Sequence, residues 1–393
     1  MNQIIENYQI AFARFFSAER AFAFWKGRVA LYALLRALDV GQGDEVIVPG
    51  YTCVMNVNPI KYVGARPIYV DIERDTFNIN ANLLDAKITN RTKVIIAQHT
   101  YGYPCDMDPI MDIARRRGVC VIEDCCLAFG SKYKGKMAGT FGRAAYFSFQ
   151  WNKPYTTGLG GMVITSDKKL IERVDALQAN EMRQPSSREV FMLSMQLLTY
   201  RLLVYPRTTA LAQSLFRYLT RKGAVVGSSG ANEFEPVKAD DFFKSASAMQ
   251  ARTGLKQLRN IEQNISHRTQ MASLYDRLLE SKGWKTRTYN GTVMQPVMVR
   301  YPVRITEKQK AIARAAKAGV ELGSWFECPL HPIETSLASY DYAAGMCPEA
   351  EKAAREVVNL PLHPRASEKT VKRTVNFITG FTQAQPNLSF ASV

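Results

Sequence analysis

Apolar residues in the first half of the chain occur in short uninterrupted runs, and segments with helical spacing of apolar residues lie between them. Such runs are typical of strands buried on both faces of a parallel sheet. Their alternation with helix-like segments predicts an α/β fold with a mostly parallel central sheet. We expect its strands at residues 45–48, 66–71, 93–99, 119–122 and 144–149.

The two ends of the chain follow other patterns. Residues 4–24 carry aromatic and aliphatic side chains close to helical spacing, which predicts an N-terminal docking helix or arm. Near the C-terminus we expect a helix at 268–279, a strand at 298–305 and a helix at 307–318, and the NLPLHP segment (359–364) precedes a last helix. We therefore predict a large domain over residues 1–240 and a smaller α+β domain over residues 241–393.

A helical insertion is expected at about residues 185–230. It contains an apolar run at 189–205, Pro206, a second run at 208–222 and a GSSG linker at 227–230. Polar residues interrupt the first run, which is also too short to span a bilayer comfortably. Two interpretations remain: basic amphipathic helices in a membrane interface, or helices packed on the protein's own body or in an oligomer interface, which we favour.

Composition narrows the class of protein. The 393 residues are 47% hydrophobic and 22% charged, as in an ordinary globular protein. The net charge of +16 favours anionic partners, but we find no zinc-finger spacing or RNA-binding motif that would indicate nucleic acid. Seven cysteines without ligand-like spacing are typical of free thiols in a reducing cytosol, not of a metal site. The N-terminus has no basic leader, so we expect a cytoplasmic protein, with peripheral contact at the inner face of the membrane left open.

Residues 124–162 hold the chemistry. Asp124 follows a predicted strand, at the sheet edge where open α/β folds bind ligands, and Lys153 follows the next strand. Gly158, Gly160 and Gly161 then let the backbone approach a flat ligand. A lysine amine can form a Schiff base, and an aspartate can keep a pyridine nitrogen protonated. The pair predicts a pyridoxal phosphate (PLP) site.

Several separate blocks of sequence carry a family resemblance. They read VIEDCCLAFG, YKGKMAGTFG, SFQWNKPYTTGLGGM, GDEVIVPGYT, ARPIYVDI and NLPLHP. In this order they resemble the DegT/DnrJ/EryC1/StrS family of sugar aminotransferases. The resemblance implies the fold-type I, aspartate aminotransferase-like architecture, with Lys153 and Asp124 as catalytic residues.

The resemblance also implies how the cofactor is bound. Gly27 and Arg28 would meet the cofactor phosphate at a helix N-terminus, where the family has Gly-Thr, and Ser148 matches a phosphate-contacting serine. The family's stacking aromatic aligns with Cys53, so we expect Tyr51 to replace it or the stacking to be weaker. Leu127 stands where the family has a polar contact to the cofactor ring.

Other departures concern single positions. Leu159 replaces a glutamate before the double glycine, and Phe243 replaces an asparagine that a neighbouring subunit contributes in the family. His99, Tyr101 and His331 are candidates for substrate contacts, and structural roles are equally compatible with the two histidines.

The function that the resemblance implies is transfer of an amino group, from glutamate, to a keto or aldehydo sugar linked to a nucleotide, in amino-sugar or surface polysaccharide biosynthesis. A homodimer is expected. Two alternatives stay open. A PLP- or PMP-dependent sugar dehydratase is one, although that branch replaces the lysine with histidine and Lys153 is retained. A catalytically silent PLP-binding, membrane-associated scaffold or regulator is the other.

Overall fold

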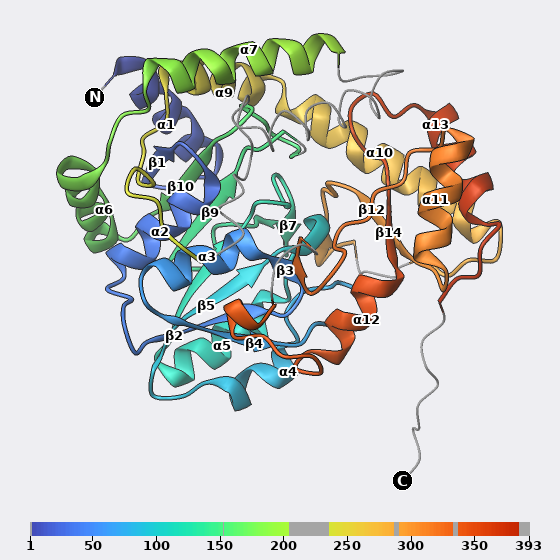
Figure 1. The fold of residues 1–393 in the computed structure, drawn as a ribbon, viewed down its shortest axis with the longest axis horizontal. Helices are drawn as coiled ribbons and strands as arrows, with labels where there is room; N and C mark the ends of the chain where they lie inside the picture. Colours follow the sequence, from blue (N-terminus) through green and yellow to red (C-terminus); the bar gives the residue numbers. More distant parts are fainter. Residues whose placement is uncertain (1, 152, 204–235, 287–290, 333–336, 385–393) are drawn as a thin grey trace.

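A seven-stranded sheet forms the centre of the protein (Figure 1). The computed structural model describes residues 2–151, 153–203, 236–286, 291–332 and 337–384. The strands of the sheet are β1 (Arg20–Phe24), β2 (Glu45–Pro49), β4 (Arg66–Val70), β5 (Thr92–Gln98), β6 (Cys120–Asp124), β9 (Ala144–Ser148) and β10 (Gly161–Thr165). Their order is β1-β10-β9-β6-β5-β2-β4, and β4, β2, β5, β6 and β9 run parallel. The five predicted strands and the mostly parallel sheet are confirmed.

Both faces of this sheet are buried. Side chains such as Val46 and Val48 pack with helices α2 (Gly27–Ala37) and α3 (Val54–Tyr62) on one face. Ile47 and Ile95 point to the other face, towards α5 (Met107–Arg117). Because successive residues of a strand alternate between faces, strands covered on both sides need continuous apolar runs. This explains the sequence pattern.

The N-terminal segment differs from the expected single helix or arm. Helix α1 (Gln3–Phe15) ends early, Ser17 has a positive φ of 54°, and residues 20–24 form the edge strand β1, antiparallel to β10. Phe22 and Phe24 face α2, whereas Ala21 and Ala23 face α1. This alternation has the period of a strand, which the helical interpretation of residues 4–24 overlooked.

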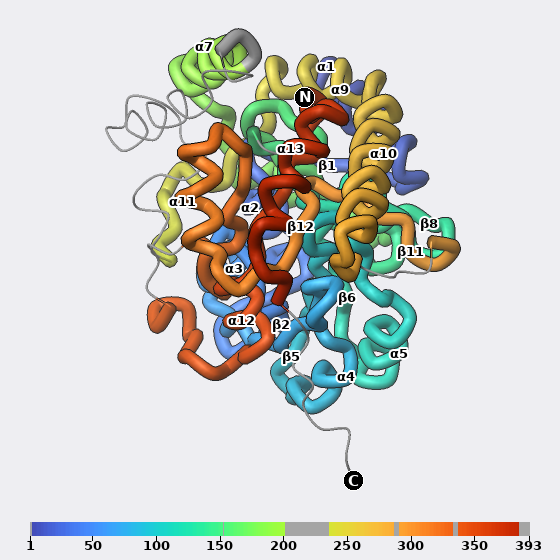
Figure 2. Tube along the Cα trace, turned by 90° about the vertical axis from the view of Figure 1, so that its right-hand side faces the viewer, coloured from blue at the N-terminus to red at the C-terminus, as the bar shows by residue number. Residues whose placement is uncertain are grey.

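The C-terminal part adds a helical layer around a small antiparallel pair of strands. Its longer elements are α9 (Ala248–Arg259), α10 (Ile261–Glu280), β12 (Tyr301–Arg304), α11 (Lys308–Ala318), α12 (Pro348–Glu356), β14 (Val357–Leu360) and α13 (Glu368–Ile378). Strands β12 and β14 pair, and α10, α11 and α13 lie around them (Figure 2). The helix expected at 268–279 is thus part of a longer one, while α9 packs on α1 of the large part. The domain boundary at residue 240 stays a prediction.

Apart from α7, the remaining described elements are α6 and a set of short strands and helical turns. They are β3 (Thr52–Cys53), α4 (Ala81–Leu84), η1 (Asp85–Lys87), η2 (Thr100–Gly102), β7 (Lys132–Tyr133), β8 (Lys136–Met137), α6 (Lys168–Glu181), β11 (Met294–Gln295), β13 (Leu330–His331) and η4 (Leu337–Tyr340).

Helix α7 (Ser187–Leu203) is the described part of the predicted insertion and lies along the outside of the molecule, at the top of Figure 1. Leu193 and Leu197 pack on Trp25, Trp151 and Leu159. On its outer side Phe191, Met195 and Leu198 are 66%, 47% and 51% exposed. The second predicted run (208–222) and the linker at 227–230 lie outside the described residues. Among the described helices, none has the length and apolar character needed to cross a bilayer.

Candidate active site

A cavity of about 410 Å³ opens at the carboxyl ends of the parallel strands, as the position of Asp124 predicted. Its walls come from the start of α2, from the segment between β2 and α3, from the ends of β5, β6 and β9, and from the loop at 325–332. The lining includes Gly27, Arg28, Cys53, Asn56, Gln98, Asp124, Leu127, Ser148, Lys153, Trp325, Phe326 and His331. Most of the predicted site residues therefore meet around one space.

Asp124 is the last residue of β6 and is only 2% exposed. Its Oδ2 accepts a hydrogen bond of 2.5 Å from the side-chain amide of Asn56, and its Oδ1 accepts one of 2.9 Å from the backbone N–H of Cys126. Donors on both oxygens stabilise the ionised carboxylate and fix its orientation. Asp124 is thus an immobilised negative charge on the cavity wall.

Lys153 enters the same cavity from the loop after β9. Its backbone N–H donates to the carbonyl of Gln150 at 3.0 Å, and its Nζ lies 5.2 Å from the centre of the Trp325 ring. The ammonium group has no hydrogen bond or ion pair with a described residue. A lysine held by an aromatic ring, with its amine otherwise available, suits a nucleophile or a proton carrier.

The predicted phosphate end is built by close packing. A Cβ on Gly27 would lie 2.6 Å from the Cβ of Ser148, so only glycine allows the start of α2 to approach β9 this closely. Lys26, the N-cap residue of α2, makes no side-chain capping hydrogen bond to the helix. The N-terminal end of the helix carries a partial positive charge. Arg28 and Ser148 line the cavity beside it. This arrangement fits an anionic group such as a phosphate.

Tyr51 lies elsewhere than the sequence led us to expect. Its side chain has no exposed surface, does not line the cavity, and packs on Phe326 with ring centres 4.9 Å apart. Its hydroxyl is 2.9 Å from that of Tyr101 and accepts the N–H of Phe326 at 3.2 Å. Tyr51 therefore supports the loop that carries Trp325 and Phe326, and these two aromatic residues line the cavity instead.

Three residues of the cavity lining, Leu127, Cys53 and Cys126, have apolar or thiol side chains. Leu127 is in the cavity lining, where its side chain offers packing and no polar contact. Cys53 and Cys126 also line the cavity, and burial raises the pKa of both thiols. At neutral pH both thiols are therefore protonated, which makes them poor nucleophiles.

His99 and Tyr101, two candidates for substrate contact, are fully buried and outside the cavity lining. The Nδ1 of His99 accepts the N–H of Cys105 at 2.9 Å, so its Nε2 carries the proton and donates to Glu123 at 3.0 Å. Glu123 also accepts N–H groups from Gly139, Phe141 and Gly142, each at 2.7 Å. The geometry favours the structural role for His99. Although Cys125 lies nearby, these bonds occupy the imidazole and carboxylate that a metal would need.

His331, the third candidate, is in the cavity. Its Nδ1 faces the N–H of Glu327 at 3.5 Å. Burial, opposed by the charge of Glu327 and reinforced by Lys308 and Lys153, lowers the pKa of His331 to about 4. The imidazole is therefore neutral at pH 7 and can donate or accept a hydrogen bond beside Lys153.

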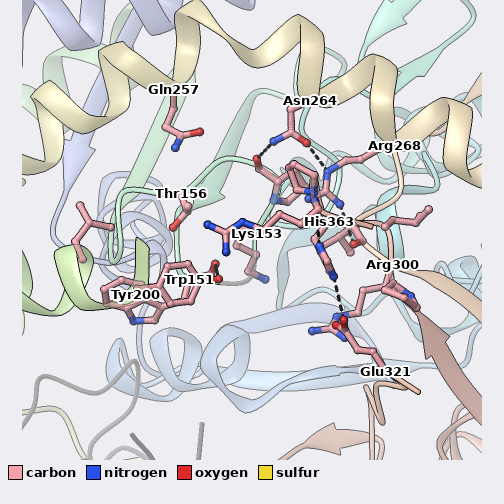
Figure 3. A pocket seen from close by; sticks show the side chains of 17 residues that line it. Trp151, Lys153, Thr156, Tyr200, Gln257, Asn264, Arg268, Arg300, Glu321 and His363 are labelled. Carbon is pink, nitrogen blue, oxygen red and sulfur yellow. Dashed lines mark hydrogen bonds and ion pairs between the residues drawn. The ribbon is translucent and has the colours of Figure 1, made fainter. Parts of the chain in front are cut away.

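A second cavity of about 240 Å³ adjoins the first through Lys153 (Figure 3). Its lining comes from the loop between β9 and β10, from α7, α9 and α10, and from loops of the C-terminal part: Trp151, Lys153, Pro154, Thr156, Leu197, Tyr200, Gln257, Asn264, Arg268, Val299, Arg300, Glu321, Pro361, Leu362, His363, Pro364 and Arg365. Four of these side chains are cationic and one is a carboxylate. The space beside the lysine therefore favours an anionic ligand.

Sequence reasoning missed Asn56, Gln98 and Trp325. Gln98 lies at the end of a predicted strand, and Asn56 lies shortly after another. Because ligands bind at the carboxyl ends of parallel strands, the sequence could have indicated both residues. Trp325 lies in a loop far along the chain, flanked by Gly323 and Pro329, and no periodicity indicates its position.

Comparison with known proteins agrees with this geometry. The profile of the DegT/DnrJ/EryC1/StrS aminotransferase family matches residues 3–202 and 245–379. A GDP-perosamine synthase of Caulobacter vibrioides is 31% identical over 383 residues, or 95% of this chain and 89% of that protein. One of Escherichia coli O157:H7 is 49% identical over 169 residues, and this match spans 43% of the chain and less than half, 46%, of that protein. The structure of Spr1654 from Streptococcus pneumoniae in its PLP form has a TM-score of 0.71 at 22% identity, covering 96% of this chain and 90% of that one, and shows the shared fold.

Proposed function

This chain belongs to the DegT/DnrJ/EryC1/StrS aminotransferase family and is a pyridoxal phosphate-dependent sugar aminotransferase, and we propose that Asp124 and Lys153 carry its chemistry. The observation that supports this assignment is their position: both side chains line one cavity of about 410 Å³, beside the start of a helix. A cavity of this size is typical of small-molecule sites.

The residues present fit the cofactor. The close contact of Gly27 with Ser148, the uncapped start of α2 and Arg28 would hold the phosphate. Asp124 would hold the proton of the ring nitrogen, and Asn56 keeps that carboxylate in place. When bound, pyridoxal phosphate supplies an electron-withdrawing ring and an aldehyde that takes up the amino group.

Lys153 would have two tasks. Its Nζ would hold the cofactor covalently, and the same amine would move a proton to and from the substrate carbon. Its available Nζ, held over Trp325, suits both. Neutral His331 lies in the same cavity and would position the substrate by hydrogen bonding.

We further propose that the acceptor is a keto sugar linked to a nucleotide and that glutamate is the donor. The relatives named GDP-perosamine synthase support a nucleotide-linked sugar, and the cationic lining of the second cavity is compatible with its phosphates. The retained Lys153 supports amination over dehydration.

The absorbance spectrum of the purified protein tests the proposal. We expect the visible band of lysine-bound cofactor to convert to the band of the amine form when glutamate is added, and to return when a keto sugar is supplied. A band that no amino donor changes would instead support the silent PLP-binding protein.

For the quaternary state we propose a homodimer. The exposed outer side of α7, formed by Phe191, Met195 and Leu198, supports contact with a second copy. Peripheral contact with an anionic membrane through this helix is the alternative. Light scattering of the wild type and of Phe191→Ser/Leu198→Ser, together with sedimentation on anionic vesicles, separates them: a monomeric variant supports the dimer, and loss of vesicle binding alone supports the membrane.

A further inference from the structure

The second cavity contains a guanidinium whose hydrogen-bond donors are available. Arg300 is partly buried, and its Cζ lies 5.2 Å from the centre of the Trp325 ring. Its Nη1 packs so closely on Gly323 that a Cβ there would be 2.6 Å away. The side chain makes no hydrogen bond or ion pair with a described residue. Stacking therefore holds the guanidinium in place while leaving its N–H groups for a ligand.

Other charged side chains of this cavity already form hydrogen bonds within the protein. Arg268 donates to the carbonyls of Met298 and Val299 at 3.2 and 2.9 Å and to Asn264 Oδ1 at 2.7 Å. The single carboxylate, Glu321, accepts a hydrogen bond of 3.0 Å from His363, as Figure 3 shows. The pKa of Glu321 is lowered overall. Burial acts to raise it, but the hydrogen bond and charge of His363 and the charge of Arg300 together have the larger effect. The carboxylate is bound to His363 and forms no ion pair with Arg300.

Trp325 links Arg300 to the reacting centre. The same indole ring contacts Arg300 Cζ and Lys153 Nζ, and both distances to its centre are 5.2 Å. Trp325 lines the cofactor cavity, whereas Arg300 lines the second cavity and Lys153 lines both. A substrate with its reacting atom at Lys153 can therefore extend an anionic group to Arg300.

We propose that Arg300 is an oxyanion-recognition residue that binds, on the Trp325 ring, the carboxylate or phosphate of a substrate whose reacting atom lies at Lys153. The inference rests on the proposed function and adds a substrate contact to it. The oxyanion belongs either to the carboxylate of the amino donor or to the diphosphate of the sugar nucleotide. A planar guanidinium binds both groups with paired hydrogen bonds.

Two unreactive probes separate these sources. Glutarate represents the donor, and guanosine diphosphate represents the sugar nucleotide. Their affinities are measured by calorimetry on the cofactor-loaded protein for the wild type, Arg300→Gln, Arg300→Lys and the control Arg314→Gln. Arg314 also stacks on an aromatic ring, Phe381, at 5.8 Å, but is exposed and outside both cavities.

We expect Arg300→Gln to lower the affinity for one of the two probes about tenfold or more, because a charge-assisted hydrogen bond is lost. Arg300→Lys should restore part of this affinity. The probe whose affinity falls shows whether the oxyanion is the donor carboxylate or the nucleotide diphosphate. KM for the matching substrate should rise, with kcat little changed. Trp325→Leu should weaken the same probe. Equal affinity of wild type and Arg300→Gln for both probes, or no binding of either probe to the wild type, would overturn the proposal.

The outcome is separable from that of the proposed function. The cofactor band and its response to glutamate report the function, and Arg300→Gln should leave the band in place. If the wild type shows no response to glutamate but the Arg300 variant still loses affinity for a probe, the anion site stands and the aminotransferase reaction fails.

Discussion

The side-chain amide of Asn56 donates to Asp124 Oδ2 across 2.5 Å and also contacts Thr52 Oγ1 and Gln98 Oε1 at 3.1 and 3.2 Å. Thr52 in turn hydrogen-bonds to Gln98, whose own amide donates to the carbonyl of Tyr51 at 3.0 Å. These bonds tie the carboxylate of Asp124, for which we propose a catalytic role, to two neighbouring strand ends. Asn56 is therefore a positioning residue for Asp124.

Asn56→Ala removes one of the two described donors to Asp124. Hydrogen bonds to charged groups contribute about 1.5–3 kcal/mol, so we expect kcat/KM to fall about 10- to 100-fold. The cofactor band of the variant should also change in position, because the carboxylate that faces the ring is held less firmly in place. Asn82→Ala, at an exposed asparagine, is the control. A variant with wild-type kinetics and spectrum would show that Asp124 needs no support from Asn56.

Lys153→Ala should abolish covalent binding of the cofactor and lower the rate of amino transfer by about 10³-fold or more, because both the nucleophile and the proton carrier are lost. Absorbance after borohydride reduction and peptide mass measurement check the attachment. The matched control is Lys136→Ala, since Lys136 is also stacked on an aromatic ring, Phe141 at 4.8 Å, but is exposed. Reduced cofactor found on another lysine would contradict the assignment.

Two parts of the site were predicted from the pattern of strands. Asp124 ends one strand and Lys153 follows another, both strands have clear apolar runs, and the ends of parallel strands meet at one edge. Gly27 and Ser148 were instead expected at the cofactor phosphate because of the family resemblance.

The parts that the sequence did not predict depend on tertiary contacts. The family's stacking aromatic aligns with Cys53, so we expected either Tyr51 at the cofactor or weaker stacking. The side chain of Tyr51 packs on Phe77, Tyr101 and Phe326, and the last of these comes from a distant loop. Trp325 takes its place in the cavity from that same loop. The edge strand β1 was missed because aromatic spacing in residues 4–24 resembled that of a helix. Long-range packing decided each case.

Glu123→Gln should destabilise the fold without removing a cavity-lining group. Glu123 is fully buried and accepts four hydrogen bonds, three from backbone N–H groups of the 139–142 turn and one from His99. An amide would place its own N–H against these donors and lose the negative charge, which we expect to lower the free energy of unfolding by about 3 kcal/mol. Urea unfolding measures it, with Glu172→Gln at an exposed position as control. A change below about 0.5 kcal/mol would contradict the role given to this carboxylate.

The acid sensitivity of the cofactor-free protein should depend on His331. Burial first, then the charges of Lys308 and Lys153, lower the pKa of this imidazole from 6.5 to about 4, although Glu327 acts in the opposite direction. The unfolded chain therefore binds a proton between pH 6.5 and 4 that the folded protein does not. The contribution of neutral His331 to stability is complete above pH 6.5 and is lost as the pH falls towards 4.

Urea unfolding at several pH values from 7 to 4 should show this loss in the wild type and a shallower dependence in His331→Gln. The imidazole C–H resonances give a direct check, because the signal that disappears in the variant should titrate near pH 4 in the folded protein. A midpoint between 6 and 7 for that signal, or identical pH dependences of the two proteins, would mean that His331 is solvated and protonated in the cavity. It could then not serve as the neutral hydrogen-bonding group beside Lys153 that the geometry indicates.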